Sequence, residues 1–251
     1  MDVLHAALLI AAGIAGGIIA ALVGGAAVIT FPALLAAGLP PVMATASNTV
    51  ALTPGLFLAA IYDRSQLPPF DRSFIALVLA SVTGALLGAA LLLLTPERVF
   101  CALVPLLLGF ATLLFANAGR IGTWLAARSK NRVSTHSATA VLPVSIYGGY
   151  FGAGVGVLML GVFSVGTGGD YRAANVTKNL VTALNSAAAS VMFVSQGAVS
   201  WPAALLMMTG TLLGGLVGAR LAQVMPNQVA RALVVGVGAL LTGAFAWRYW
   251  I

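Results

Sequence analysis

The sequence predicts an all-α integral membrane protein with two inverted repeats, each with a broken or re-entrant hairpin plus three transmembrane helices. Hydrophobic residues make up 61% of the 251 residues, and Asp, Glu, Lys and Arg make up 7%, whereas a soluble domain carries about 25% charged residues. Several charge-free runs are long enough to cross a bilayer. The two halves also contain similar short motifs in the same order. The first two observations predict membrane helices, and the third predicts the repeats.

Eight apolar segments follow from the charge-free runs and from the Gly and Pro turn signals that divide them. A spanning helix needs about 20 apolar residues. Two segments are longer than one span and contain clustered glycines, which predicts a broken or re-entrant helix in each; close helix packing at small residues is the alternative. The eight segments are 3–37, 42–62, 73–95, 98–117, 137–166, 173–195, 202–224 and 228–250, of which 3–37 and 137–166 are the long ones.

The internal repeat divides the chain into a first membrane repeat (1–116), a basic cytoplasmic linker loop (117–136) and a second membrane repeat (137–251). Gly-Gly pairs open both halves, and a Gly-x-x-x-Gly motif recurs later in each. Duplicated units are typical of secondary transporters. The matched motifs are Gly16-Gly17 with Gly148-Gly149, and Gly84-x-x-x-Gly88 with Gly210-x-x-x-Gly214.

Loop charges predict the orientation of the two halves. The linker 117–136 carries four Lys or Arg residues, so the positive-inside rule places it in the cytoplasm. If segment 137–166 enters the membrane and returns, Arg172, Arg220 and Arg231 also face the cytoplasm; if it crosses once, they face outside. The first arrangement fits the rule better and makes the halves inverted. The alternative is eight plain spans with parallel repeats.

The predicted spans lack the acidic residues and catalytic motifs that several function classes require. All five carboxylates fall at segment ends, whereas proton-driven carriers and cation channels usually keep acidic residues at membrane depth. The sequence has no metalloprotease motif, and its single cysteine, Cys101, excludes an intrachain disulfide. The net charge of +7 is explained by loop residues rather than by nucleic-acid binding. We therefore expect no catalytic residue, no metal, no cofactor and no nucleic-acid partner.

Two polar clusters lie at membrane depth, each at the predicted start of the helix that follows a long segment. Helix N-termini favour anions, and a lysine in the second cluster adds a positive charge. Two inverted halves would bring both clusters together around an anion. For a single Ser or Thr, bonding to its own helix is the alternative, and the lysine could instead reach the headgroups. The predicted binding residues are Ser47, Asn48, Thr49, Thr53, Thr177, Lys178, Asn179 and Asn185.

Glycines of the two long segments are predicted to let the tips of the broken helices approach the anion. Two of these candidate hinge residues precede the first polar cluster, and two precede the second. They are Gly24, Gly25, Gly154 and Gly156.

The order of these motifs resembles the TauE/SafE family of sulfite exporters over nearly the whole chain. The similar stretches are 24–32 and 44–48 in the first half, and 148–156, 173–179 and 196–201 in the second. One departure is Ala26-Ala27, where first copies of the family often have a third glycine. The resemblance implies a multi-pass protein of the bacterial inner membrane that transports sulfite, organosulfonates such as sulfoacetate, or other small anions.

The sequence therefore predicts a secondary transporter, an exporter, for a small sulfur-containing anion such as sulfite or an organosulfonate, working by alternating access in the lipid bilayer. The alternatives are an anion or neutral-solute channel and a carrier of another carboxylate or oxyanion. The sequence leaves open the exact anion, the direction of transport, the coupling ion (H⁺, Na⁺ or none) and whether the protein is a homo-oligomer.

Overall fold

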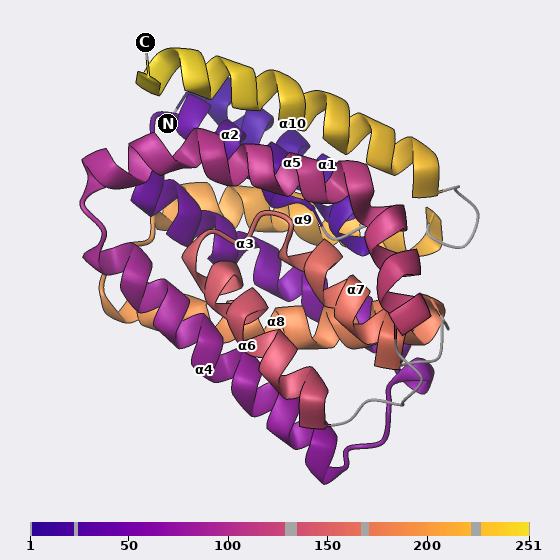
Figure 1. Ribbon diagram of the computed structural model, residues 1–251. Coiled ribbons are helices and arrows are strands. Elements are labelled where there is room, and N and C mark those ends of the chain that lie inside the picture. The colour runs from indigo at the N-terminus through magenta and orange to yellow at the C-terminus, as the bar shows by residue number, and fades with distance from the viewer. Residues whose placement is uncertain (1, 23–24, 129–134, 167–170, 222–226, 251) are drawn as a thin grey trace.

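The computed structural model describes residues 2–22, 25–128, 135–166, 171–221 and 227–250 (Figure 1). These residues form α-helices and one short 3-10 turn, and the described ranges contain no strand. The elements are α1 (Val3–Leu22), α2 (Ala27–Ala36), α3 (Pro41–Tyr62), η1 (Arg64–Gln66), α4 (Arg72–Leu94), α5 (Glu97–Arg128), α6 (Thr135–Tyr150), α7 (Val155–Gly166), α8 (Tyr171–Ser195), α9 (Trp201–Leu221) and α10 (Asn227–Trp250).

Five helices of the described part are long and apolar enough to cross a membrane. They are α1, α3, α4, the Glu97–Asn117 part of α5 and the Trp201–Gly218 part of α9. The prediction of an all-α, multi-pass membrane protein is confirmed. Helix α8 contains too many polar residues to join this group, and it packs against α3, α4, α6 and α7. Polar residues are tolerated at membrane depth when they face other helices rather than lipid.

Both long segments are divided into two helices, at the places where the glycine clusters predicted a break. Helix α1 ends at Leu22 and α2 begins at Ala27; α6 ends at Tyr150 and α7 begins at Val155. In the second break Gly152 and Gly154 have φ angles of +78° and +81°, which glycine adopts without a steric penalty. The chain can therefore turn sharply between α6 and α7.

The Gly-x-x-x-Gly motifs lie where two pairs of helices make their closest contacts. Helix α9 packs along α1, and α4 packs along α6. A methyl group on Gly214 would overlap the Ile14 carbonyl oxygen, and one on Gly88 would overlap the Ile146 carbonyl oxygen. Only glycine lets the backbones approach this closely, as in many helix pairs within membranes. The matching motifs of the two halves therefore perform the same packing task.

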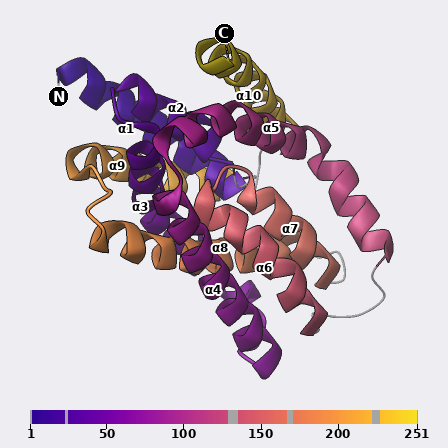
Figure 2. The same cartoon turned by 60° about the vertical axis from the view of Figure 1, so that its left-hand side comes forward.

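Helices α3 and α8 pack against each other and run in opposite directions. At one end of the pair the Ser47 hydroxyl accepts a hydrogen bond of 2.9 Å from the Ser200 N–H, just beyond the end of α8. At the other end Arg172, near the start of α8, donates to both carboxylate oxygens of Asp63 at 2.6 and 2.8 Å. Helices α5 and α10 lie side by side with the C-terminus of α10 near the start of α5 (Figures 1 and 2).

The segment predicted as a linker loop differs from the structure in part. Helix α5 continues to Arg128, so residues 117–128 are helical rather than a loop; residues 129–134 lie outside the described ranges. The stretch 118–128 contains no proline, and its Ala, Leu and Arg residues favour continuation of a helix despite Gly119 and Gly122. At 1.5 Å per residue, the 32 residues of α5 extend roughly 48 Å, beyond the hydrocarbon core of a bilayer.

Candidate functional site

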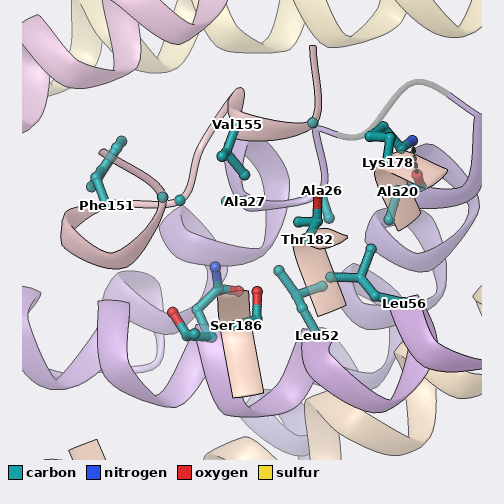
Figure 3. Close-up of a pocket in the computed structure, with 15 residues that line it drawn as sticks. Ala20, Ala26, Ala27, Leu52, Leu56, Phe151, Val155, Lys178, Thr182 and Ser186 are labelled. Carbon is teal, nitrogen blue, oxygen red and sulfur yellow. Dashed lines mark hydrogen bonds between the residues drawn. The ribbon is translucent and has the colours of Figure 1, made fainter. Parts of the chain in front are cut away.

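A cavity of about 40 Å³ lies where the two broken segments meet α3 and α8 (Figure 3). The end of α1, the starts of α2 and α7, and the break between α6 and α7 all contribute to its wall. The lining residues are Ala20, Ala26, Ala27, Asn48, Thr49, Leu52, Leu56, Gly148, Phe151, Gly152, Val155, Gly156, Lys178, Thr182 and Ser186.

Lys178 is the charged residue among those that line the cavity, and it is fully buried. Its Nζ donates to the Ala20 carbonyl oxygen at 3.4 Å (Figure 3). This carbonyl belongs to the last turn of α1, where backbone oxygens lack helical partners and the helix dipole is negative. No described carboxylate forms an ion pair with Lys178, and Asp63 is paired with Arg172. The ammonium group is thus only partly compensated.

Two polar atoms of the cavity wall have no hydrogen-bond partner. They are Oδ1 of Asn48 and Oγ1 of Thr182, on side chains that are 3% and 5% exposed. A buried polar atom without a partner costs about 1–3 kcal/mol, so such atoms are rare in folded proteins. The Asn48 amide can present either its oxygen or its NH₂ group to the cavity. Both residues are therefore free to bind a ligand.

The cavity also lies beside the N-terminal ends of α2 and α7. Ala26 and Ala27 line it from the start of α2, and Val155 and Gly156 from the start of α7. The helix dipole is positive at an N-terminus, although the N–H groups of Val28, Val155 and Val157 already donate to backbone oxygens just before each helix. Two short helices therefore add positive potential to the site.

The sequence predicted helix termini at this site but attributed them to the wrong helices. Helix α3 begins at Pro41 and α8 at Tyr171, so Asn48 and Lys178 lie about two turns inside their helices. Pro41 fixes the start of α3, because proline suits the first position of a helix and lacks the N–H that the position leaves unpaired. The helix N-termini near the cavity belong to α2 and α7.

Asn48, Thr49 and Lys178 are the predicted binding residues that line the cavity, but most of the predicted hydroxyls have partners within their own helix. Thr49 donates to the Thr45 carbonyl at 2.9 Å, Thr53 to the Thr49 carbonyl at 2.7 Å and Thr177 to the Ala173 carbonyl at 2.7 Å. These are the bonds to the preceding turn that Ser and Thr often form in membrane helices.

The remaining three predicted residues, like Thr53 and Thr177, lie outside the cavity wall. Ser47 contacts Ser200, as described above. Asn179 is buried with Oδ1 unpartnered. Asn185 joins three helices, since its amide donates to the carbonyl oxygens of Ser81 on α4 and Ser145 on α6 at 3.2 and 3.3 Å. Asn185 therefore fixes α8 against α4 and α6.

The predicted hinge glycines have different environments. Gly24 lies outside the described residues. A methyl group on Gly25 would overlap the ring of Phe115, so this glycine permits close packing against α5. Gly154 has the positive φ described above, and Gly156 lines the cavity.

Thr182 and Ser186 line the cavity but were absent from the predicted binding residues. Lys178, Thr182 and Ser186 follow one another at four-residue steps on α8, and residues at this spacing share a helix face. Both residues could have been predicted from the sequence, because they lie four and eight residues after Lys178 and so share its helix face.

Comparison with known proteins agrees with this architecture. Residues 9–245 match the family model described as sulfite exporter TauE/SafE. A probable membrane transporter protein of Sinorhizobium is 33% identical over 94% of this chain and 90% of its own length. Probable membrane transporter proteins of Haemophilus influenzae and Escherichia coli are each 26% identical, over 96% and 90% of this chain and 94% and 84% of their own lengths. No solved structure matches the chain. The chain therefore belongs to the TauE/SafE family of membrane transporters.

Proposed function

We propose that the protein is a secondary transporter that exports a small sulfur-containing anion, such as sulfite or an organosulfonate, across the bacterial inner membrane. The observation that carries this proposal is the buried, partly compensated ammonium group of Lys178 at the cavity. A buried charge is costly unless an opposite charge compensates it. An anion in the cavity would supply that compensation.

The surroundings of Lys178 favour an anion over a cation or a neutral solute. The positive ends of α2 and α7 face the same cavity, and helix N-termini are common anion sites. The carboxylates among the described residues do not line the cavity. Within the proposed site, Lys178 is the charge partner and Asn48 and Thr182 donate hydrogen bonds, while Ser47 and Asn185 hold neighbouring elements in place.

The proposed mechanism is alternating access between two inverted halves. Three features support it: α3 and α8 run antiparallel, the α1–α9 contact has its counterpart in α6–α4, and each half contains one broken segment. Transporters built this way bind substrate between the halves and open to each side in turn. The cavity lies between α3 of the first half and α8 of the second.

Flux measurements test the proposed function directly. Purified protein in liposomes should exchange internal sulfite or organosulfonate for the same external anion, and the rate should saturate with concentration. Saturation is expected because a carrier binds each anion before it changes conformation. A current that rises without saturation would instead identify a channel, and absence of flux for all small anions would contradict the proposal.

Thr182→Val should weaken anion binding about tenfold, because it removes a buried donor while keeping the shape of the side chain. Thr177→Val is the matched control, since the Thr177 hydroxyl already donates to the Ala173 carbonyl on the same helix. Isothermal titration calorimetry of both variants checks this prediction. Equal affinities for the two variants would show that the Thr182 hydroxyl does not bind the anion.

A further inference from the structure

The two helices that face the cavity from opposite halves present unlike side chains at matching positions. Helix α8 contributes Lys178, Thr182 and Ser186, and α3 contributes Asn48, Leu52 and Leu56, each series at four-residue steps. After the first residue of each series, α8 has the hydroxyl residues Thr182 and Ser186, whereas α3 has Leu52 and Leu56. The walls of the cavity are chemically asymmetric although the helices are equivalent.

This asymmetry disfavours an inorganic oxyanion as the main occupant. Sulfate presents oxygens on every side, and each buried charged oxygen needs a donor to replace its lost water. The side-chain donors lie on α8 and at Asn48. Thr49 of α3 also lines the cavity, but its hydroxyl donates to the Thr45 carbonyl, and Leu52 and Leu56 can donate nothing. Phe151 adds a further apolar surface, at the end of the cavity away from Lys178 (Figure 3).

The charge of the cavity matches a single negative charge. Lys178 is the cationic residue among the lining residues. A second negative charge on the occupant would therefore lack a side chain of opposite sign. The volume of about 40 Å³ corresponds to about three water-sized groups, which suits a small head group with a short carbon chain.

We infer that the cavity selects a small organic monoanion, whose sulfonate or carboxylate head binds Lys178 and Thr182 and whose one or two carbons pack on Leu52 and Leu56. Inorganic oxyanions bind more weakly. This inference rests on the proposed function and narrows its substrate class, with Leu52 and Leu56 as the residues that determine specificity.

Calorimetric titration of the purified full-length protein tests the inference without any variant. Propionate and glycolate have the same charge and nearly the same shape, but a methyl group in one replaces a hydroxyl group in the other. Propionate should bind about tenfold more tightly, because the apolar wall leaves the glycolate hydroxyl unpaired. Methanesulfonate should likewise bind more tightly than sulfate.

Leu52→Thr tests the role of the apolar wall, since it gives α3 the side chain that α8 has at the matched position. The roughly tenfold preference for propionate over glycolate should disappear in this variant, because the new hydroxyl can form a hydrogen bond with the glycolate hydroxyl. Leu107→Thr is the matched control: Leu107 is a half-buried leucine of the core that does not line the cavity, and its variant should keep the preference. Leu52→Met, which conserves volume and apolar character, should keep it as well.

The outcomes separate this inference from the proposed function. Equal binding of propionate and glycolate by the unmodified protein, or sulfate binding as tight as methanesulfonate binding, overturns the inference and leaves anion transport standing. An unchanged preference in folded Leu52→Thr also overturns it. Binding of sulfite but of none of these four anions overturns the inference alone. If sulfite does not bind either, the proposed anion site itself is wrong.

Discussion

Lys178→Met should lower the affinity for the transported anion at least about 100-fold. Removing one partner of a buried charge pair typically costs 2–5 kcal/mol or more, and about 2.7 kcal/mol corresponds to 100-fold. Methionine keeps an unbranched side chain of similar length, so the loss can be attributed to the charge. Isothermal titration calorimetry with purified protein measures the affinity, and exchange in liposomes measures transport.

Lys178→Arg separates charge from shape. The guanidinium group keeps the charge but is larger and planar, and the cavity of about 40 Å³ leaves little space for it. We expect intermediate affinity, between that of the unmodified protein and that of Lys178→Met. Full affinity in Lys178→Met would contradict the assignment of Lys178 to the site.

Thermal stability distinguishes a binding lysine from a structural one. Lys178 contacts the last turn of α1 through the Ala20 carbonyl at 3.4 Å, so it could serve only to cap that helix. A buried charge that lacks a full partner destabilises the fold, and its replacement by an apolar residue is often neutral or stabilising. The Tm of Lys178→Met without anion should therefore be equal or higher. A large fall in Tm with unchanged anion affinity would identify Lys178 as a helix cap.

The sequence located the helices well because their main determinants are local. The lengths of the apolar runs set the spans, and the glycine clusters set both breaks, so the long segments 3–37 and 137–166 each contain two helices. Lys178 and Asn48 could also be recognised, because polar side chains at membrane depth are costly and rarely lack a purpose.

The choice of partners around the cavity could not be predicted, because it depends on the rotation of α3 against α8. Aligning residues 44–49 with 174–180, which needs one residue of slippage, pairs Asn48 with Asn179, whereas Lys178 rather than Asn179 lines the cavity beside Asn48. One residue corresponds to about 100° of rotation on a helix with 3.6 residues per turn, so this difference moves Asn179 off the cavity face. Tertiary packing fixes this rotation, and repeat motifs with one residue of slippage cannot.

Gly149→Ala should destabilise the protein by about 3 kcal/mol, which makes it the substitution with the largest expected effect on folding. The added methyl group would overlap the Ala85 carbonyl oxygen, carbon and Cα, all of them backbone atoms that cannot move independently of α4. Overpacking typically costs about 1–3 kcal/mol, occasionally more, and a backbone obstacle places this site at the upper end. Thermal unfolding in detergent measures the change.

Gly236→Ala is the matched control, because Gly236 also lies in a helix but has no atom within 4 Å of the position its methyl group would take. Alanine favours a helix by up to about 1 kcal/mol over glycine, so this variant should be neutral or more stable. An equal loss in both variants would show that glycine has a general role in these helices rather than a role in close contact.

Gly17→Ala extends the same prediction to the first half of the protein, because Gly16-Gly17 matches Gly148-Gly149. Its methyl group would overlap the Thr211 carbonyl oxygen and the Gly215 nitrogen of α9, in the contact that corresponds to α6 against α4. If α1–α9 and α6–α4 are equivalent contacts of an inverted repeat, Gly17→Ala and Gly149→Ala should destabilise the protein by similar amounts. A large penalty in one half alone would mean that the two contacts differ in how closely the backbones must approach. In that case the two halves would share their glycine motifs but not the close helix packing that those motifs permit.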